Sequence, residues 1–262
     1  MAVSFDLERR GEADSVQNFI EGVFGVRRET HHHKLWYRGH ASSSFQLLPS
    51  IGRHKEYASR KKEFTSDNER QLLHRFRRRA FPHDPEVRDA GYALFLARHY
   101  GLPTRLLDWT ANALFALYFC CIEHADHDGH VWAIRQREDA DIQDAFCLAR
   151  QHSEATLLGK SPRPEVKIIH PVYNSTRVVA QDGGFTMHGD PWQPLETCAG
   201  LLFEPAALDI ERLYRWDVPG NKKGDIVREL SGLGITHRTL FPDLDGIARS
   251  LWETEVLWNG RP

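Results

Sequence analysis

Residues 99–121, HYGLPTRLLDWTANALFALYFCC, constrain the fold more than any other part of the chain. A glycine and a proline near the start end any helix that precedes them, because proline lacks a backbone donor and has a fixed φ angle. The apolar run at 113–121 then has the length and composition of a buried helix, with Thr110 or Asn112 as its N-cap. We therefore expect a polar loop that ends on a core helix, an arrangement that can hold reactive groups at the rim of a pocket.

The polar part of this stretch places a cation, an anion, an indole and a hydroxyl within six residues: Arg105, Asp108, Trp109 and Thr110. Such a cluster is typical of a binding or catalytic site. The alternative is a structural ion pair between Arg105 and Asp108 that covers the start of the helix. Ion-pair networks produce the same cluster, so the residue types alone leave both interpretations open.

The rest of the chain mixes the two periodicities of regular secondary structure. No repeat, low-complexity tract or linker divides it, so we expect one α+β domain with a mixed or antiparallel sheet core flanked by helices. The pattern predicts helices at 12–27, 68–76, 84–98, 113–121, 221–233 and a last one ending at 251. It predicts strands at 34–40, 130–135, 166–172 and 213–218, and a pair within 174–188 around an Asp-Gly-Gly turn; 138–165 is expected to be irregular.

The strand expected at 34–40 is the most informative of these. Its side chains alternate between the two faces of a sheet, so Tyr37 and Arg38 point in opposite directions. Gly39 has no side chain and allows another backbone to approach closely. The three histidines just before it, at 31–33, lack the spacing of a metal site and are expected in a surface loop.

The net charge of −2 gives the whole protein no bias toward nucleic acid, but the charges are unevenly spread. Residues 53–79 hold ten Lys and Arg against four Asp and Glu. The basic face of the helix in this segment could contact phosphates, whose attraction to Lys and Arg dominates nucleic-acid affinity. The alternative is a solvated helix face that acidic residues elsewhere balance, and the near-neutral total slightly favours it.

The four cysteines show neither metal spacing nor a disulfide framework. No apolar stretch approaches the roughly 18 residues of a membrane span. The N-terminus is acidic and polar, unlike a signal peptide. We therefore expect a cytoplasmic protein with reduced thiols and no membrane partner.

Several separated motifs together resemble the FRG domain, a family named for a Phe-Arg-Gly tripeptide. The tripeptide is here Tyr37-Arg38-Gly39, with tyrosine in the first position. The further motifs are Leu-Pro-Ser at 48–50 with Arg53, the stretch 99–121, the segment 177–185 and the closing segment 234–246. The resemblance covers 17–252, which leaves an N-terminal extension at 1–16 and a C-terminal tail at 253–262.

A weaker resemblance links the layout to mono-ADP-ribosyltransferases. In those folds a strand Arg or His holds NAD, a Ser-Thr-Ser-like motif supports the nicotinamide side, and a later carboxylate stabilises the ribosyl oxocarbenium. The resemblance implies an ADP-ribosyltransferase-like fold with NAD as substrate. It implies catalytic roles for Arg38, Asp108, Thr110 and Gln181, and NAD-binding roles for Tyr37, Arg38, Gly39, His99, Thr104, Arg105 and Trp109.

The identity of the catalytic carboxylate stays open at this point. Asp and Trp stand in the middle motif where serine is usual, and the amide of Gln181 cannot act as a general base. Asp243 and Asp245 are equally well explained as caps of the final helix. The candidates are Glu69, Asp108, Asp243, Asp245 and Glu255.

We expect a transferase of toxin or phage-defence type that modifies a macromolecule, with RNA or DNA favoured over protein because of the basic helix. Such an enzyme needs a neutralising partner, such as an antitoxin, in its host. One alternative is a module that binds a nucleotide or RNA without chemistry, through Arg38, Arg105 and Trp109. Another is a metal-dependent nuclease, although no spacing specifically favours its ligands; these would be Glu69, Asp108, Asp243 and Asp245.

Overall fold

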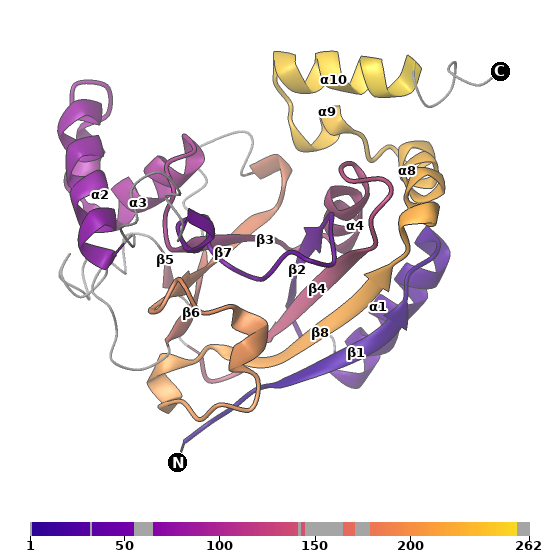
Figure 1. Cartoon of the computed structure of the whole chain (residues 1–262), viewed down its shortest axis with the longest axis horizontal. Coiled ribbons are helices and arrows are strands. Elements are labelled where there is room, and N and C mark those ends of the chain that lie inside the picture. Colours follow the sequence, from indigo (N-terminus) through magenta and orange to yellow (C-terminus); the bar gives the residue numbers. More distant parts are fainter. Residues whose placement is uncertain are drawn as a thin grey trace.

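Segments with alternating apolar residues pair into one sheet that runs through the molecule (Figure 1). The computed structural model describes residues 2–31, 33–54, 65–140, 143–144, 165–170 and 179–255. Within these residues the sheet has eight strands, in the order β1-β8-β4-β2-β3-β7-β6-β5. The strands are β1 (Asp6–Glu12), β2 (Leu35–His40), β3 (Leu106–Thr110), β4 (Gly129–Gln136), β5 (Gln143–Asp144), β6 (Val166–His170), β7 (Gly183–His188) and β8 (Ile210–Val218).

The sheet is mixed but mainly antiparallel. Only the outer pairs β1–β8 and β5–β6 are parallel among the described strands. The α-helices are α1 (Val16–Glu29), α2 (Ser66–Ala80), α3 (Ala90–His99), α4 (Ala113–Cys121), α8 (Lys223–Gly232), α9 (His237–Leu240) and α10 (Leu244–Thr254). The predicted α+β class, with a mixed sheet flanked by helices, is confirmed. The segment expected as an N-terminal extension contains the edge strand β1.

The two faces of the sheet carry separate cores. On one face α1, α4 and α8 bury their apolar side chains against β2, β4 and β8. On the other face loops and short 3-10 turns cover Trp36, Trp109 and Trp132. A third cluster joins α2 and α3 to the far strands of the sheet, and Figure 1 shows these two helices grouped at that end. Alternation along each strand produces this division, because successive side chains point to opposite faces.

The close approach expected at Gly39 is found where α4 crosses β2. A Cβ atom on Gly39 would lie 2.0 Å from the carbonyl oxygen of Ala116 and 2.6 Å from the amide nitrogen of Cys120. Only glycine allows this backbone contact. Asn112 is the N-cap of α4, since its side chain accepts from the amides of Leu114 and Phe115.

The prediction of a polar loop before α4 is wrong in one important respect, because Leu106–Thr110 form the strand β3. Its residues pair with β7 over their whole length, and Thr110 also pairs with Tyr37 of β2. This pairing with distant strands supplies the backbone hydrogen bonds that a local reading of the sequence does not reveal. Asp108 and Trp109 therefore lie on a rigid strand.

Two other expected elements differ from the structure. The helix predicted at 84–98 is divided: a 3-10 turn, Pro85–Arg88, is followed by α3, because the Asp89 side chain accepts from the amide of Tyr92 and starts a new helix. The first strand predicted within 174–188 lies partly outside the described residues, and the described Val179 and Ala180 are helical. Most of 138–165 also lies outside the described residues.

The remaining expectations concern membranes and thiols. Among the described residues, none of the helices has the length and apolar character needed to cross a bilayer. The cysteines described are free and buried: Cys120, Cys121 and Cys198.

Candidate functional site

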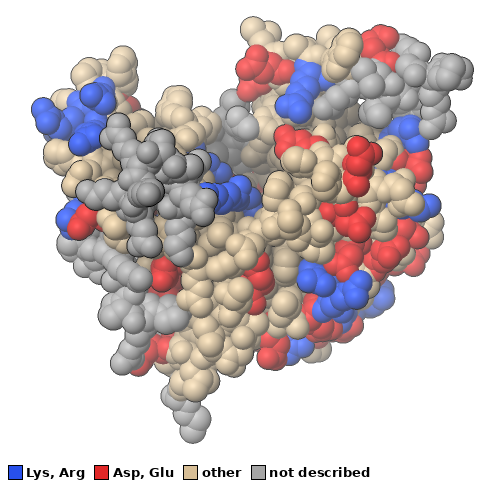
Figure 2. Space-filling view, in the orientation of Figure 1, with Lys and Arg blue, Asp and Glu red and all other residues tan. Residues whose placement is uncertain are grey.

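A cleft of about 1460 Å³ opens beside the middle of the sheet. Its floor is formed by β2, β3 and the start of β7, one wall by the end of α3 and the loop before residue 53, and the other by α4, α9 and the start of α10. Figure 2 shows this hollow between two raised parts of the surface, with Lys or Arg side chains at its base. The cleft therefore lies where β2 and β3, the strands of the Tyr-Arg-Gly and Asp-Trp-Thr motifs, are adjacent.

Three arginines surround one carboxylate on the cleft floor. The Nη2 atom of Arg98 donates to Oδ2 of Asp108. The Nη1 atom of Arg38 donates to the backbone carbonyl oxygen of Asp108 at 2.6 Å and lies 3.8 Å from Oδ2. Arg53 also lines the cleft, where its Nε donates to the carbonyl oxygen of Leu48 at 3.1 Å. On the floor, three cations thus face one anion; elsewhere the cleft lining holds Arg249 and three acids, Glu123, Asp243 and Asp245.

Burial and neighbouring charges set the protonation states of Arg38, Asp108 and His40. Burial lowers the pKa of Arg38 to about 9, with Asp108 opposing the change, so the guanidinium is a cation at neutral pH. Partial burial raises the pKa of the Asp108 carboxyl, but Arg98 and Arg38 outweigh it and hold that pKa below its ordinary value. Burial, reinforced by Arg38 and Arg53, holds the pKa of His40 well below 6.5. Neutral His40 can therefore accept, and its Nε2 does so from Nε of Arg38 at 3.1 Å.

Some hydrogen-bond donors in the cleft have no acceptor within the described part of the chain. They are Nε of Arg98 and the indole nitrogen of Trp192, both buried atoms of residues that line the cleft. Buried donors normally find a partner, since an unsatisfied one costs about 1–3 kcal/mol. A ligand rich in acceptor oxygens would satisfy them.

Aromatic rings line the cleft above this floor. Phe45 is 43% exposed on one wall. On the other wall His237 stacks on Phe241, with ring centroids 4.3 Å apart, and Phe119 meets Phe241 edge to face. Ring faces beside guanidinium groups are the surroundings that a nucleotide base and its phosphates require.

Most of the residues predicted for the site line the cleft. They are Tyr37, Arg38, Gly39, His99, Asp108, Trp109, Thr110 and Gln181. Several of them also have structural partners. The indole of Trp109 is only 4% exposed and donates to Oγ1 of Thr186, so most of its ring is core.

A chain of hydrogen bonds ties the cleft floor to the wall that α9 forms. Oγ1 of Thr110 donates to the backbone carbonyl of Gln181 at 2.6 Å. The side-chain amide of Gln181 in turn donates to the carbonyl of Leu240 at 3.2 Å. These two polar side chains therefore position the cleft walls, and the amide nitrogen of Gln181 is already engaged.

Thr104 and Arg105 do not line the cleft. Arg105 is 1% exposed, and its Nη2 and Nε donate to Oε2 of Glu69 at 2.7 and 3.0 Å. The structural ion pair considered between Arg105 and Asp108 is therefore wrong in its partners, because Arg105 pairs with Glu69 and Asp108 with Arg98 and Arg38. In extended chain, side chains three residues apart point to opposite faces of the sheet.

The candidate carboxylates lie at different places in the structure. Glu69 is buried in its pair with Arg105, and Glu255 lies at the C-terminal end of α10 outside the residues that line the cleft. Asp243 lines the cleft with Asp245, and it also caps α10 by accepting from the amide of Gly246 at 2.8 Å. Asp108 is the carboxylate at the centre of the arginine group.

No group of three or more His, Cys, Asp or Glu suited to a metal ion is found in the ranges that the structure describes.

Residues that the sequence analysis did not assign to the site also converge there. Arg98 and Arg53 were outside the predicted set, and so were Phe45, Trp192 and Phe241. Arg98 sits ten positions before Asp108, at the end of the helix that the glycine and proline terminate, which is the one local signal for it. Arg53 belonged to the motif with Leu-Pro-Ser at 48–50, but the sequence predicted no role for it in the site.

Part of the chain that forms this cleft matches the model of a known protein family. Residues 33–129 match the family model of the FRG domain, and they contain β2, Arg53, Arg98, β3 and α4. No curated protein and no solved structure matches the chain significantly. The matched segment therefore supplies the arginines, the carboxylate and the core helix of the site, and the chain carries an FRG domain.

Proposed function

We propose that the cleft binds a dinucleotide through its phosphates and that the protein transfers ADP-ribose from NAD to a macromolecular acceptor. The observation that carries this proposal is the composition of the cleft floor, where three arginines face one carboxylate and buried donors have no acceptor among the residues that the structure describes. A diphosphate offers several anionic oxygens in a small volume. Guanidinium groups bind such oxygens in pairs, and charge-assisted hydrogen bonds of this kind are about twice as strong as neutral ones.

The size and walls of the cleft support a dinucleotide over a single phosphate. Its volume of about 1460 Å³ exceeds the roughly 300–1,000 Å³ of sites for drug-sized ligands. Phe45 and Phe241 both line the cleft and could each contact a ring of the ligand. The arginines of the floor would then hold the phosphates that join the two halves.

The chemistry requires one bond to break and another to form. The bond between nicotinamide and the ribose carbon breaks, and its electron pair leaves with nicotinamide. The ribose becomes an oxocarbenium ion, which a nearby negative charge stabilises. Asp108 is the group we assign to this role, because it stays ionised at neutral pH. An oxygen or nitrogen of the acceptor then bonds to the same ribose carbon and loses a proton to solvent or a base.

The wider biological role follows from this activity. We favour RNA or DNA as acceptor, because of the basic segment that ends in α2. A transferase that modifies nucleic acid in its own host fits a toxin or phage-defence system, and it would need a neutralising protein partner.

A second candidate function is nucleotide binding without chemistry. It is favoured by the partners of Asp108, which accepts from Arg98 and lies near Arg38, so that much of its charge is compensated. The amide nitrogen of Gln181 is likewise engaged with Leu240. In this alternative the cleft retains its ligand unchanged.

Nicotinamide release separates the two candidates. Purified protein is incubated with NAD, with and without total RNA, DNA and protein extract, beside Asp108→Asn and Arg38→Gln. A transferase loses release in both variants, by about 100-fold or more if Asp108 stabilises the transition state. Arg28→Gln, a change at an exposed arginine of α1, is the control and should retain full release.

Bound NAD without release in any mixture would establish the binding module. Neither binding nor release by the wild type would contradict both candidates.

A further inference from the structure

Helix α2 carries a row of arginines on its outer side. Arg75, Arg78 and Arg79 are exposed and follow the spacing of three and four residues that places side chains on one helix face. Neither a hydrogen bond nor an ion pair to any of them occurs in the described part of the chain. Figure 2 shows Lys or Arg side chains gathered on this part of the surface, at the position of α2 in Figure 1. We call these three residues the arginine row.

The row stands on a firmly held helix. On the inner side of α2, Leu73 is buried in the third core cluster and Glu69 is buried in its pair with Arg105. Near its end, Nε of Arg77 donates to the carbonyl oxygen of Val87 at 2.8 Å. Arg77 therefore has a structural role, while the side chains of the arginine row face solvent. Because the helix holds the backbone of these arginines in place, less entropy is lost when they bind a ligand.

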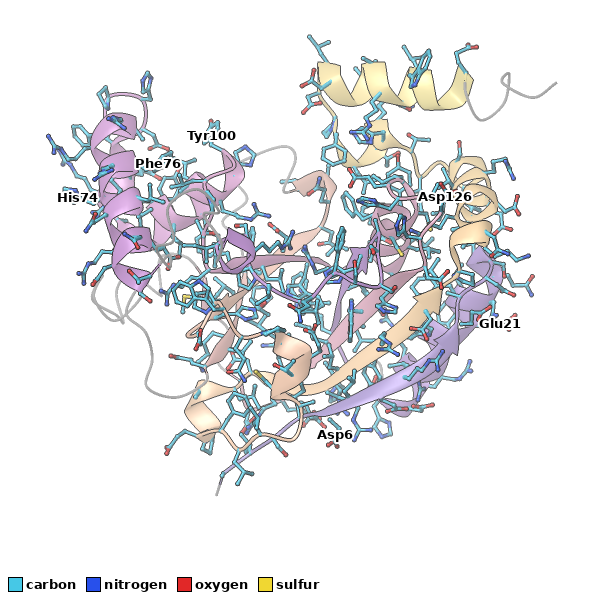
Figure 3. The ribbon with its side chains drawn as sticks, viewed as in Figure 1. Asp6, Glu21, His74, Phe76, Tyr100 and Asp126 are labelled. Carbon is cyan, nitrogen blue, oxygen red and sulfur yellow. The ribbon has the colours of Figure 1, made fainter. Side chains whose placement is uncertain are left out.

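The helix that carries the arginine row packs on a helix that lines the cleft. Helix α2 packs on α3, and the last residues of α3, Arg98 and His99, line the cleft. Tyr100 follows directly, is 73% exposed and touches His99, with ring centroids 5.1 Å apart. In Figure 3, Tyr100 lies on the side of α2 that faces α10. An exposed aromatic ring thus lies next to a residue that lines the cleft, on the helix against which α2 packs.

The charge distribution makes the row distinct from the rest of the surface. The whole protein has a net charge of −2, so the excess of cations is local. In Figure 2, the opposite side of this view, over α1, β1 and α8, carries most of the visible Asp and Glu side chains, with Lys and Arg side chains among them. Cations concentrated on α2 attract a polyanion toward this helix before contact, which raises the rate of correct association.

We infer that the arginine row binds the phosphate backbone of single-stranded nucleic acid and that Tyr100 stacks on one of its bases at the mouth of the cleft. Three guanidinium groups without a partner among the described residues match successive phosphates, which supply most of the affinity in nucleic-acid binding. An exposed ring favours a single strand over a duplex or an acidic protein, since only an unpaired base offers its face. Delivery of the strand as an acceptor rests on the proposed function, whereas binding of the strand does not.

The test measures strand binding in the absence of NAD. Fluorescence anisotropy follows labelled RNA and DNA single strands of about 20 nucleotides, a length that covers the binding sites typical of such proteins. The variant is Arg75→Gln, Arg78→Gln and Arg79→Gln together. The matched control removes three exposed cations elsewhere, through Arg28→Gln, Lys222→Gln and Arg238→Gln, and changes the net charge equally.

The salt dependence of strand affinity should differ between the wild type and the variant of the arginine row. Each phosphate contact on a single strand contributes about 0.7 to the slope of log affinity against log salt, so the row variant should lose about 2 from that slope. Its affinity at low salt should fall by about tenfold or more. Tyr100→Ala should weaken single-strand binding while binding to a duplex of the same sequence changes little. The RNA and DNA arms show which of the two strands binds more tightly.

Equal loss in the row variant and the control would overturn the inference, because net charge alone would then explain binding. Failure of the wild type to bind either strand would overturn it as well. NAD binding to the row variant is measured in parallel and should equal that of the wild type. If the cleft then fails to bind NAD while the strand still binds, only the proposed function is lost.

Discussion

At the scale of single residues, the cleft depends on which groups are charged and which are neutral. Arg38 stays cationic and keeps its direction because neutral His40 accepts from its Nε. A second neutral histidine lies behind the floor. His188 is buried, and its Nε2 accepts from Oγ1 of Thr186, which itself accepts from the indole of Trp109. This chain of hydrogen bonds links the indole of Trp109 to the neutral imidazole of His188.

The same histidine makes stability depend on pH. Burial, with the charges of Arg105 and Arg38, lowers the pKa of His188 to about 3. A histidine in the unfolded chain has a pKa near 6.5, so below that pH the unfolded state binds a proton that the folded state does not. The free energy of unfolding should therefore fall as the pH drops from about 6.5 to 5, by at most about 1.4 kcal/mol per pH unit for this group.

Urea denaturation at a series of pH values measures this slope. His188→Asn should flatten the slope, because the titrating group is removed while a side chain of similar polarity remains. A slope that is identical in the wild type and the variant would show that His188 takes no part in it.

At the scale of elements, the site rests on the packing of α4 against β2. The glycine of the Tyr-Arg-Gly motif lets the helix backbone reach the strand that carries Arg38. That contact also fixes the depth of the cleft, since Phe119 of α4 forms part of its wall. The tripeptide therefore combines Arg38, for which we propose a binding role, with the packing residue that positions its strand.

Gly39→Ala tests this role of the contact. The added methyl group would lie 2.0 Å from a backbone carbonyl oxygen, so α4 must shift, and we expect a loss of about 3 kcal/mol or more in the free energy of unfolding. Gly25→Ala in α1 is the matched control, because a Cβ there meets nothing within 4 Å. The control should be neutral or stabilising by up to about 1 kcal/mol. Thermal or chemical unfolding that ranks the two variants equally would contradict the packing argument.

At the scale of the whole molecule, local patterns predicted the fold class, most helices, and β2, β4, β6, β7 and β8. They did not predict β3, because its hydrogen bonds come from β7, more than 70 residues later in the chain. Arg98 and Arg53 were missed because tertiary packing brings them to Asp108: Arg98 from the end of α3, and Arg53 from a loop that is hydrogen-bonded to Thr104. Arg105 was assigned to the site from its motif, but Glu69, 36 positions earlier, holds it in the core.

The central claim is that the cleft arginines bind the phosphates of a nucleotide, and NAD titration followed by calorimetry at pH 7.5 tests it most directly. The wild type is compared with Arg98→Gln, which removes one guanidinium from the floor, and with Arg75→Gln, which removes an exposed one from α2. We predict that the wild type binds NAD, that Arg98→Gln binds about tenfold more weakly or worse, and that Arg75→Gln binds equally. Equal affinity in all three proteins, or no binding by the wild type, would contradict the account.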